Sequence, residues 1–121
     1  MFFLDLGDKN IQIQYRYSSV VEMENKLDMS FSNILIKMGT SIDFKTISAA
    51  IWAGARKHYP NADIKQIEQW LDDYFDENEE VGIDQLQQMI VDEWEKCAFF
   101  PQVPSRSKDK EQNNDKEQTT E

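Results

Sequence analysis

The stretch FKTISAAIWAGARKHYP, residues 44–60, decides the fold, because its apolar side chains recur with the spacing of an α-helix. Asp43 precedes this stretch and is a plausible N-cap, since aspartate readily accepts a hydrogen bond from the first free amides. Pro60 disfavours α geometry in the preceding residue, so we expect the helix to end near Tyr59. The stripe that this helix should bury consists of Phe44, Ile47, Ile51 and Ala55.

Small residues surround Trp52 on the same helix, namely Ala49, Ala50, Ala53 and Gly54. Such residues let neighbouring helices approach closely around one bulky side chain. We therefore expect Trp52 to be a core residue.

Two helical patterns come before this central helix and two follow it. Before it, the chain becomes helical from Ser18, and a short second helix starts at Phe31 and should stop at Gly39. After it, Asp63 and Asp84 each open an amphipathic helix with apolar residues at intervals of three and four. The pattern predicts about five helices.

The first seventeen residues have a different period. Residues 2–6 are mostly apolar, residues 7–10 have a turn composition, and residues 11–17 alternate between apolar and polar side chains. This predicts a β-hairpin over residues 2–17. An exposed edge strand is a template for pairing with another chain, so we expect self-association into a homo-oligomer through this strand. The candidate residues are Ile11, Ile13 and Tyr15.

The predicted fold class is mainly α, with a small N-terminal β-hairpin, a bundle of about five helices and a disordered tail. The folded domain should cover residues 1–103. Residues 104–121 contain no hydrophobic residue, so they cannot bury enough apolar surface to offset the loss of chain entropy. We expect this segment to be a disordered polar tail.

The charge balance disfavours whole classes of partner. Thirteen Lys and Arg oppose 23 Asp and Glu, so the formal net charge is −10. A nucleic acid or an anionic membrane surface would be repelled, and neither is an expected partner. No apolar run is long enough for a membrane span, and the N-terminus lacks the basic region of a signal peptide. The single cysteine, Cys97, excludes an internal disulfide and suggests a reducing compartment.

No pattern in the chain indicates catalysis, a cofactor or a metal ion. His58 lies where a helix C-terminus favours a cation, and Cys97 lies on an apolar stripe. The acidic run from Asp72 resembles a calcium loop started at Asp76, but position 6 is Val81 and position 12 is Gln87, where Gly and Glu are required. Phosphate loops, GxSxG, HExxH and CxxC motifs are also missing. We therefore expect a protein that is not an enzyme.

Aromatic residues make up 12% of the chain, which points to binding. Large apolar side chains at the edge of a small domain are either the margin of the core or a surface that contacts a partner. The candidate partner-binding residues are Trp70, Tyr74, Phe99 and Phe100.

The segment from Ile47 to Ile64, ISAAIWAGARKHYPNADI, resembles the central segment of the tail assembly chaperones of long-tailed bacteriophages of the siphovirus type. In that family a helix with a Leu/Ile-Trp/Tyr-Ala-Gly/Ala core ends in a basic turn of the His-Pro kind, and a capped amphipathic helix follows. The N-terminal hairpin and the short helix with Glu22 and Glu24 agree with the same pattern, so the resemblance covers roughly residues 2–100. The familiar His-Pro pair is split here by Tyr59.

The resemblance implies a non-enzymatic role in virion morphogenesis. Such proteins bind the tape-measure protein, a long helical polypeptide, keep it soluble and help to recruit tail-tube protein around it. They act in the host cytoplasm and are absent from the mature virion. The main alternative is a small acidic inhibitor that mimics nucleic acid and occupies a basic partner, and a small calcium-responsive regulatory domain comes after it.

Overall fold

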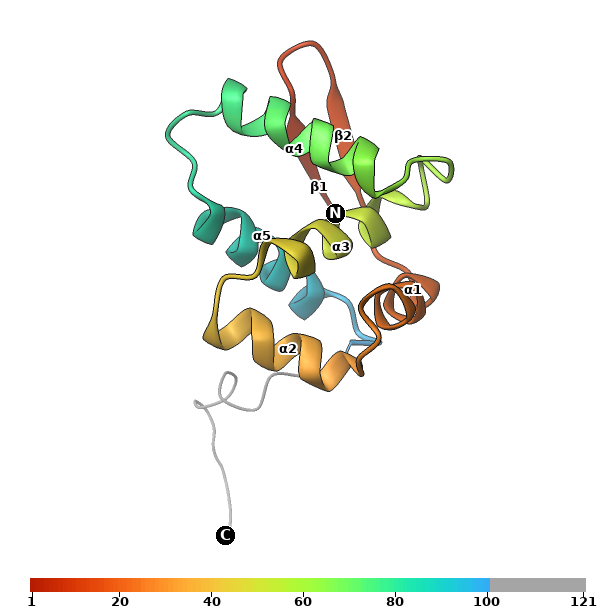
Figure 1. Ribbon diagram of the computed structural model, residues 1–121. Helices are drawn as coiled ribbons and strands as arrows, with labels where there is room; N and C mark the ends of the chain where they lie inside the picture. Colours follow the sequence, from red (N-terminus) through yellow and green to blue (C-terminus); the bar gives the residue numbers. More distant parts are fainter. Residues whose placement is uncertain (101–121) are drawn as a thin grey trace, which may run out of the picture.

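Five helices follow one β-hairpin in the computed structural model, which describes residues 1–100 (Figure 1). The expected mainly α fold with an N-terminal hairpin is confirmed. The predicted tail, residues 104–121, lies outside the described residues. No helix in the described part is long and apolar enough to cross a membrane. The elements are β1 (Phe2–Asp5), β2 (Asn10–Ile13), α1 (Tyr17–Leu27), α2 (Phe31–Thr40), α3 (Phe44–Ala55), α4 (Ile64–Glu77) and α5 (Ile83–Lys96).

Helix α3 is the centre of the structure and contacts α1, α4, α5 and β2. Its small residues allow these close approaches, as expected from the sequence. Gly54 is the tightest case: a Cβ atom there would lie 2.5 Å from Ile13 Cγ2 and 2.8 Å from Tyr15 Cζ. The Gly54 carbonyl also accepts a hydrogen bond from the Gln14 amide at 2.8 Å, which joins α3 to the chain that follows β2.

Capping side chains set the starts of α3 and α4 as predicted. Asp43 accepts a hydrogen bond from the Lys45 amide at 3.2 Å, and Asp63 accepts one from the Gln66 amide at 2.9 Å. The end of α3 differs from the prediction, because the helix stops at Ala55. The Ala55 carbonyl then accepts hydrogen bonds from His58 and Tyr59 in a tighter turn before Pro60.

Two other predicted boundaries were wrong. Helix α2 continues through Gly39 to Thr40, since Gly39 does not adopt the positive φ of a glycine that ends a helix. The hairpin ends at Ile13, because Tyr17 already belongs to α1. Strands β1 and β2 pair antiparallel, and Gly7 supplies the positive φ of 94° that their turn needs.

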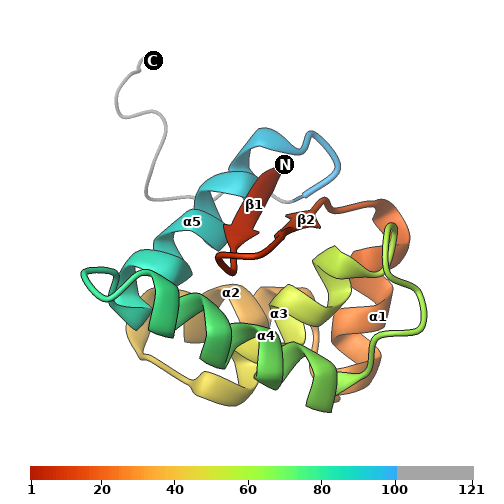
Figure 2. The ribbon, with the colours of Figure 1, turned by 90° about the horizontal axis from the view of Figure 1, so that it is seen from above.

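The hairpin lies against α3 and α4, so one of its faces belongs to the core (Figures 1 and 2). Leu4, Ile11 and Ile13 are buried there, which explains the alternating pattern of the two strands. The side-chain amide of Asn78, just after α4, donates a hydrogen bond from Nδ2 to the backbone carbonyl of Asp5 at 2.9 Å. This bond ties the far end of the hairpin to the bundle.

Four buried aromatic rings form a cluster beside the C-terminal end of α5. The Trp94 ring stacks on Phe100 at 5.6 Å between centroids, and Phe31 meets Trp94 edge to face at 5.1 Å. The Tyr15 hydroxyl donates a buried hydrogen bond of 2.7 Å to the Ala50 carbonyl. We call this set the aromatic cluster: Tyr15, Phe31, Trp94 and Phe100.

The expectation that Trp52 is a core residue was wrong, because its side chain is only partly buried. Lys26 Nζ lies 4.5 Å from the centroid of the indole ring, and Arg56 Cζ lies 5.0 Å from it. Arg56 also pairs with Glu22 at 3.2 Å. Trp52 therefore packs against the margin of the core, and Lys26 and Arg56 cover part of its ring.

Candidate functional site

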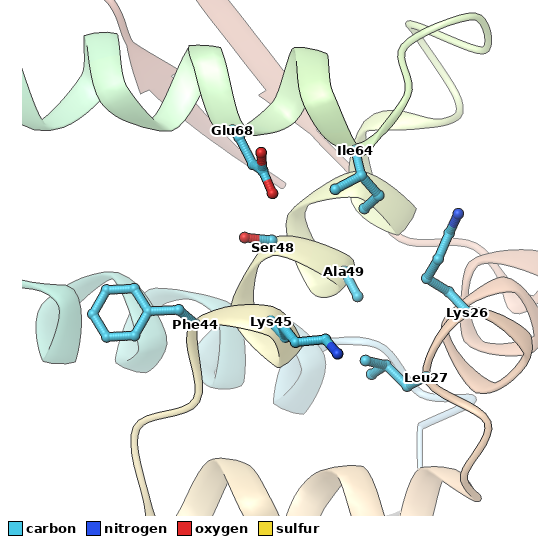
Figure 3. A pocket seen from close by; sticks show the side chains of 8 residues that line it. All are labelled: Lys26, Leu27, Phe44, Lys45, Ser48, Ala49, Ile64 and Glu68. Atoms are coloured by element: carbon cyan, nitrogen blue, oxygen red, sulfur yellow. The ribbon is translucent and has the colours of Figure 1, made fainter.

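A groove crosses the first turns of α3 and runs along α4. It consists of two adjoining hollows of about 260 and 370 Å³, which share Phe44, Ser48 and Glu68. In Figure 3, Glu68 points from α4 toward Ser48, while Phe44 and Lys45 point to opposite sides at the start of α3. We call this feature the Phe44 groove. Its other lining residues are Lys26, Leu27, Lys45, Ile47, Ala49, Ile64, Leu71, Asp72, Phe75 and Ile83.

Phe44 is the most exposed apolar side chain of the groove, with 64% of its surface accessible. It is the first residue of α3, directly after the Asp43 cap, so its ring projects beyond the part of the helix that other elements cover. The groove floor is apolar, since Ile47 and Ala49 are buried and Leu71 and Phe75 are partly buried. An apolar hollow with a projecting aromatic ring is typical of a contact with another polypeptide.

Asp43 fixes the position of Phe44. Its carboxylate accepts hydrogen bonds from Lys37 Nζ at 2.8 Å and from Thr46 Oγ1 at 3.0 Å, besides the bond from the Lys45 amide. These donors, with Lys37 first, hold the pKa of Asp43 below its usual value. The end of α2 and the start of α3 are thereby joined beneath the projecting ring.

Charged side chains of opposite sign line the two ends of the groove. Lys26 and Lys45 belong only to the smaller hollow, Asp72 belongs only to the larger one, and Glu68 lies where they meet. Within residues 1–100, none of these four side chains has an ion-pair partner. The groove therefore has one basic end and one acidic end.

The separation of basic from acidic side chains in the groove extends over the whole bundle. Residues 16–57, which include α1, α2 and α3, carry six basic and four acidic side chains. Residues 66–95, which include most of α4 and α5, carry eleven acidic side chains and no Lys or Arg. The net charge of −10 is therefore concentrated on one half of the sequence, and the Phe44 groove lies at the boundary between the two halves.

Three of the four candidate partner-binding residues proved to be core residues: Trp70, Tyr74 and Phe100 are buried. The Trp70 ring packs edge to face on Tyr59 at 5.2 Å, with Lys9 Nζ 5.6 Å from its centroid. Tyr74 lies beside Met89, its hydroxyl 3.9 Å from the sulfur, and burial raises the pKa of Tyr74. The hairpin and its turn cover this side of α4. The helical spacing of the apolar residues in α4 did not predict this cover.

Phe99 is the one candidate of this group that lies on the surface, with 44% of its area exposed. It borders a hollow of about 320 Å³ between α1 and the start of α2, together with the exposed Tyr17 and Val21. Phe99 and the adjacent Phe100 thus have opposite environments. The chain turns after α5, so that Phe100 enters the aromatic cluster and Phe99 stays outside.

The predicted self-association edge also needs correction. Ile11, Ile13 and Tyr15 are buried against the bundle, so their side chains do not face a second chain. The outer edge of this segment is already occupied: the Gln12 amide donates to the Tyr59 hydroxyl at 3.2 Å and the Gln14 amide donates to the Gly54 carbonyl. Both acceptors lie at least forty residues further along the chain.

The residues considered for chemistry have ordinary surroundings. His58 is exposed, and its Nε2 lies 3.1 Å from Gln14 Oε1. Burial is the main cause that raises the pKa of the Cys97 thiol, which disfavours the thiolate. Across residues 1–100, no group of three His, Cys, Asp or Glu side chains is placed to hold a metal ion.

Sequence reasoning missed the role of Phe44, which was counted as part of the buried stripe. The position of Phe44 in the sequence does indicate this exposure. It is a large apolar residue in the first turn of the helix, and neighbouring elements cover the end of a helix less than its middle. The neighbouring Ile42 is exposed as well.

No family model matches the chain, and no curated protein or solved structure is significantly similar to it.

Proposed function

We propose that this protein is a tail assembly chaperone that binds an apolar face of a long helical client, the tape-measure protein of a siphovirus-type phage. The observation that carries the proposal is the Phe44 groove. It offers an apolar floor, a projecting aromatic ring and charged rims, which suit an amphipathic helix. The phage context rests on the resemblance of residues 47–64 to such chaperones.

The charge of the molecule fits this task. A client with a long apolar face aggregates unless many copies of a chaperone cover it, and those copies must stay soluble while crowded together. A net charge of −10 keeps them apart in solution. In this proposal the protein works by binding alone in the host cytoplasm, helps to recruit tail-tube protein and leaves before the virion is complete.

Co-expression with the tape-measure protein tests the proposal. We expect the wild-type protein to raise the soluble yield of the client and to co-purify with it. Phe44→Ser should abolish both effects, whereas Ile36→Ser should not. Ile36 is a matched control, because it is 61% exposed on α2 and does not line the groove. A client whose solubility is the same with and without the protein contradicts the proposal.

One observation favours a second candidate, an acidic inhibitor that mimics nucleic acid. Eleven acidic side chains between residues 66 and 95, without a basic one, could occupy the basic channel of a nuclease or a repressor. The two functions differ in what they need from the groove. Binding to a basic partner would survive Phe44→Ser and would weaken steeply with added salt, whereas binding to a helical client would depend on Phe44.

A further inference from the structure

The two ends of the Phe44 groove have opposite charges, and this polarity constrains what the groove can bind. Lys26 and Lys45 line the end near Leu27 and Ile64, while Asp72 lines the end near Phe75. Lys45, Glu68 and Asp72 are exposed and have no ion-pair partner among residues 1–100. A ligand therefore meets free charges of both signs within one groove.

We propose that the Phe44 groove recognises a helix with a defined charge pattern: an apolar stripe with an acidic side chain at one end and a basic side chain at the other. This inference rests on the proposed function, because it specifies the segment of the client that binds. The acidic side chain of the ligand lies near Lys26 and Lys45, and its basic side chain lies near Glu68 and Asp72.

The length of the groove sets the spacing of the two charges. Ile64 and Asp72 mark its two ends on α4 and are separated by about 12 Å, at a rise of about 1.5 Å per residue. A ligand helix lying along α4 therefore presents its two charges about eight residues apart, or roughly two turns. Its apolar side chains lie between them, over Phe44, Ile47 and Leu71.

The overall charge of the protein makes a competing prediction, and this makes the proposal testable. A field from a net charge of −10 attracts the most basic ligand, whatever the local arrangement of charges in the groove. Recognition by the groove instead favours a ligand of zero net charge with one acid and one base. The two explanations therefore rank the same set of peptides differently.

The test uses three labelled helical peptides with the same apolar stripe, each stapled to equalise its helix content, titrated with the full chain at low salt. Their two end positions, eight residues apart, carry acid and base, base and base, or acid and acid. We expect the acid–base peptide to bind tightest, by about fivefold over the base–base peptide. Tightest binding by the base–base peptide would overturn the proposal and leave helix binding intact.

Lys45→Glu should reverse the preference, because it replaces one of the two cations of the basic end with a carboxylate, and the overall negative charge then favours the base–base peptide. Lys57→Glu is the matched control: it changes the net charge equally at an exposed residue outside the groove, and it should leave the ranking unchanged. If both variants reverse the ranking, net charge alone explains it and the proposal is wrong.

Two other outcomes have separate meanings. If no peptide binds, the groove is not a helix site, and the proposed function loses the observation that carries it. If the wild-type protein dimerises in sedimentation experiments and Phe44→Ser dissociates the dimer, a second copy occupies the groove, and the proposal of a charge-patterned ligand fails.

Discussion

The aromatic cluster and the Phe44 groove use the same kind of side chain in opposite ways. In the cluster, the Trp94 indole is enclosed by other rings, and the Tyr15 hydroxyl has a buried carbonyl as its partner. In the groove, Phe44 projects from the start of a helix, and the charged side chains that line the groove have no ion-pair partner among residues 1–100. The rings of the first region are enclosed within one chain, whereas the second region has exposed apolar surface and charged side chains without ion-pair partners among residues 1–100.

The difference shows that a high aromatic content does not locate a binding surface by itself. The sequence marked Trp70, Tyr74 and Phe100 as candidates for partner contacts, but the fold buries them in the core. The exposed ring of the groove belongs to Phe44, which the helical period had assigned to the interior. Four measurements test this difference between the two regions, and we give them in order of decreasing effect on stability.

Trp94→Ala should cause the largest loss, about 3–5 kcal/mol of unfolding free energy, which is usual when a buried tryptophan is removed. The substitution removes the ring that contacts Tyr15, Phe31 and Phe100 at once. Urea denaturation followed by far-UV circular dichroism measures the loss. A loss below 1 kcal/mol would mean that the cluster is loosely packed and that the contrast with the groove does not hold.

Gly54→Ala should destabilise the protein by about 1–3 kcal/mol, because the new methyl group overlaps Ile13 and Tyr15. This change tests whether Ile13 and Tyr15 pack tightly against α3 beside the aromatic cluster. Gly39→Ala is the control, since a Cβ there has nothing within 4 Å and lies inside a helix, where alanine is preferred. Equal midpoints of thermal unfolding for the two variants would contradict the tight contact.

Asp43→Asn should remove a pH-dependent contribution of under about 1 kcal/mol, typical of a partly exposed ion pair. The pKa of Asp43 is lowered on folding, mainly by Lys37, so its contribution is complete above the ordinary value of 3.8 and is lost as the pH falls below it. The gap in stability between wild type and variant should be full at pH 6 and should narrow as the pH falls below 3.8. Denaturant titrations over a series of pH values from 6 to 2 measure this, and a gap that stays constant over the whole series would show that the carboxylate charge is not its cause.

Phe44→Ser should have the smallest effect on stability, within about 0.5 kcal/mol, because the ring is mostly exposed. Its effect on binding should be large: we expect affinity for a helical peptide to fall about thirtyfold, as at an aromatic hot spot. Fluorescence anisotropy and thermal unfolding together separate the two effects. A strongly destabilised variant would place Phe44 in the core after all.

The sequence alone determined the elements and much of their order. Asp43 and Asp63 mark the starts of α3 and α4, since a carboxylate beside free amide groups acts over only two or three residues. The alternation in residues 11–15 and the small residues of α3 likewise predicted a strand and a closely packed central helix. The pattern of charge along the chain was also visible, although its meaning for a groove was not.

Tertiary structure decided which apolar side chains are covered. A helical period identifies the face of a helix that turns inward, but the position of the neighbouring elements determines how far along that face the cover extends. Phe44 lies beyond that cover, Trp52 lies beside it under Lys26 and Arg56, and Phe100 returns to the core after α5 has ended. The β2 edge was closed by Tyr59 and Gly54, which are distant in sequence, so no local pattern could have shown it.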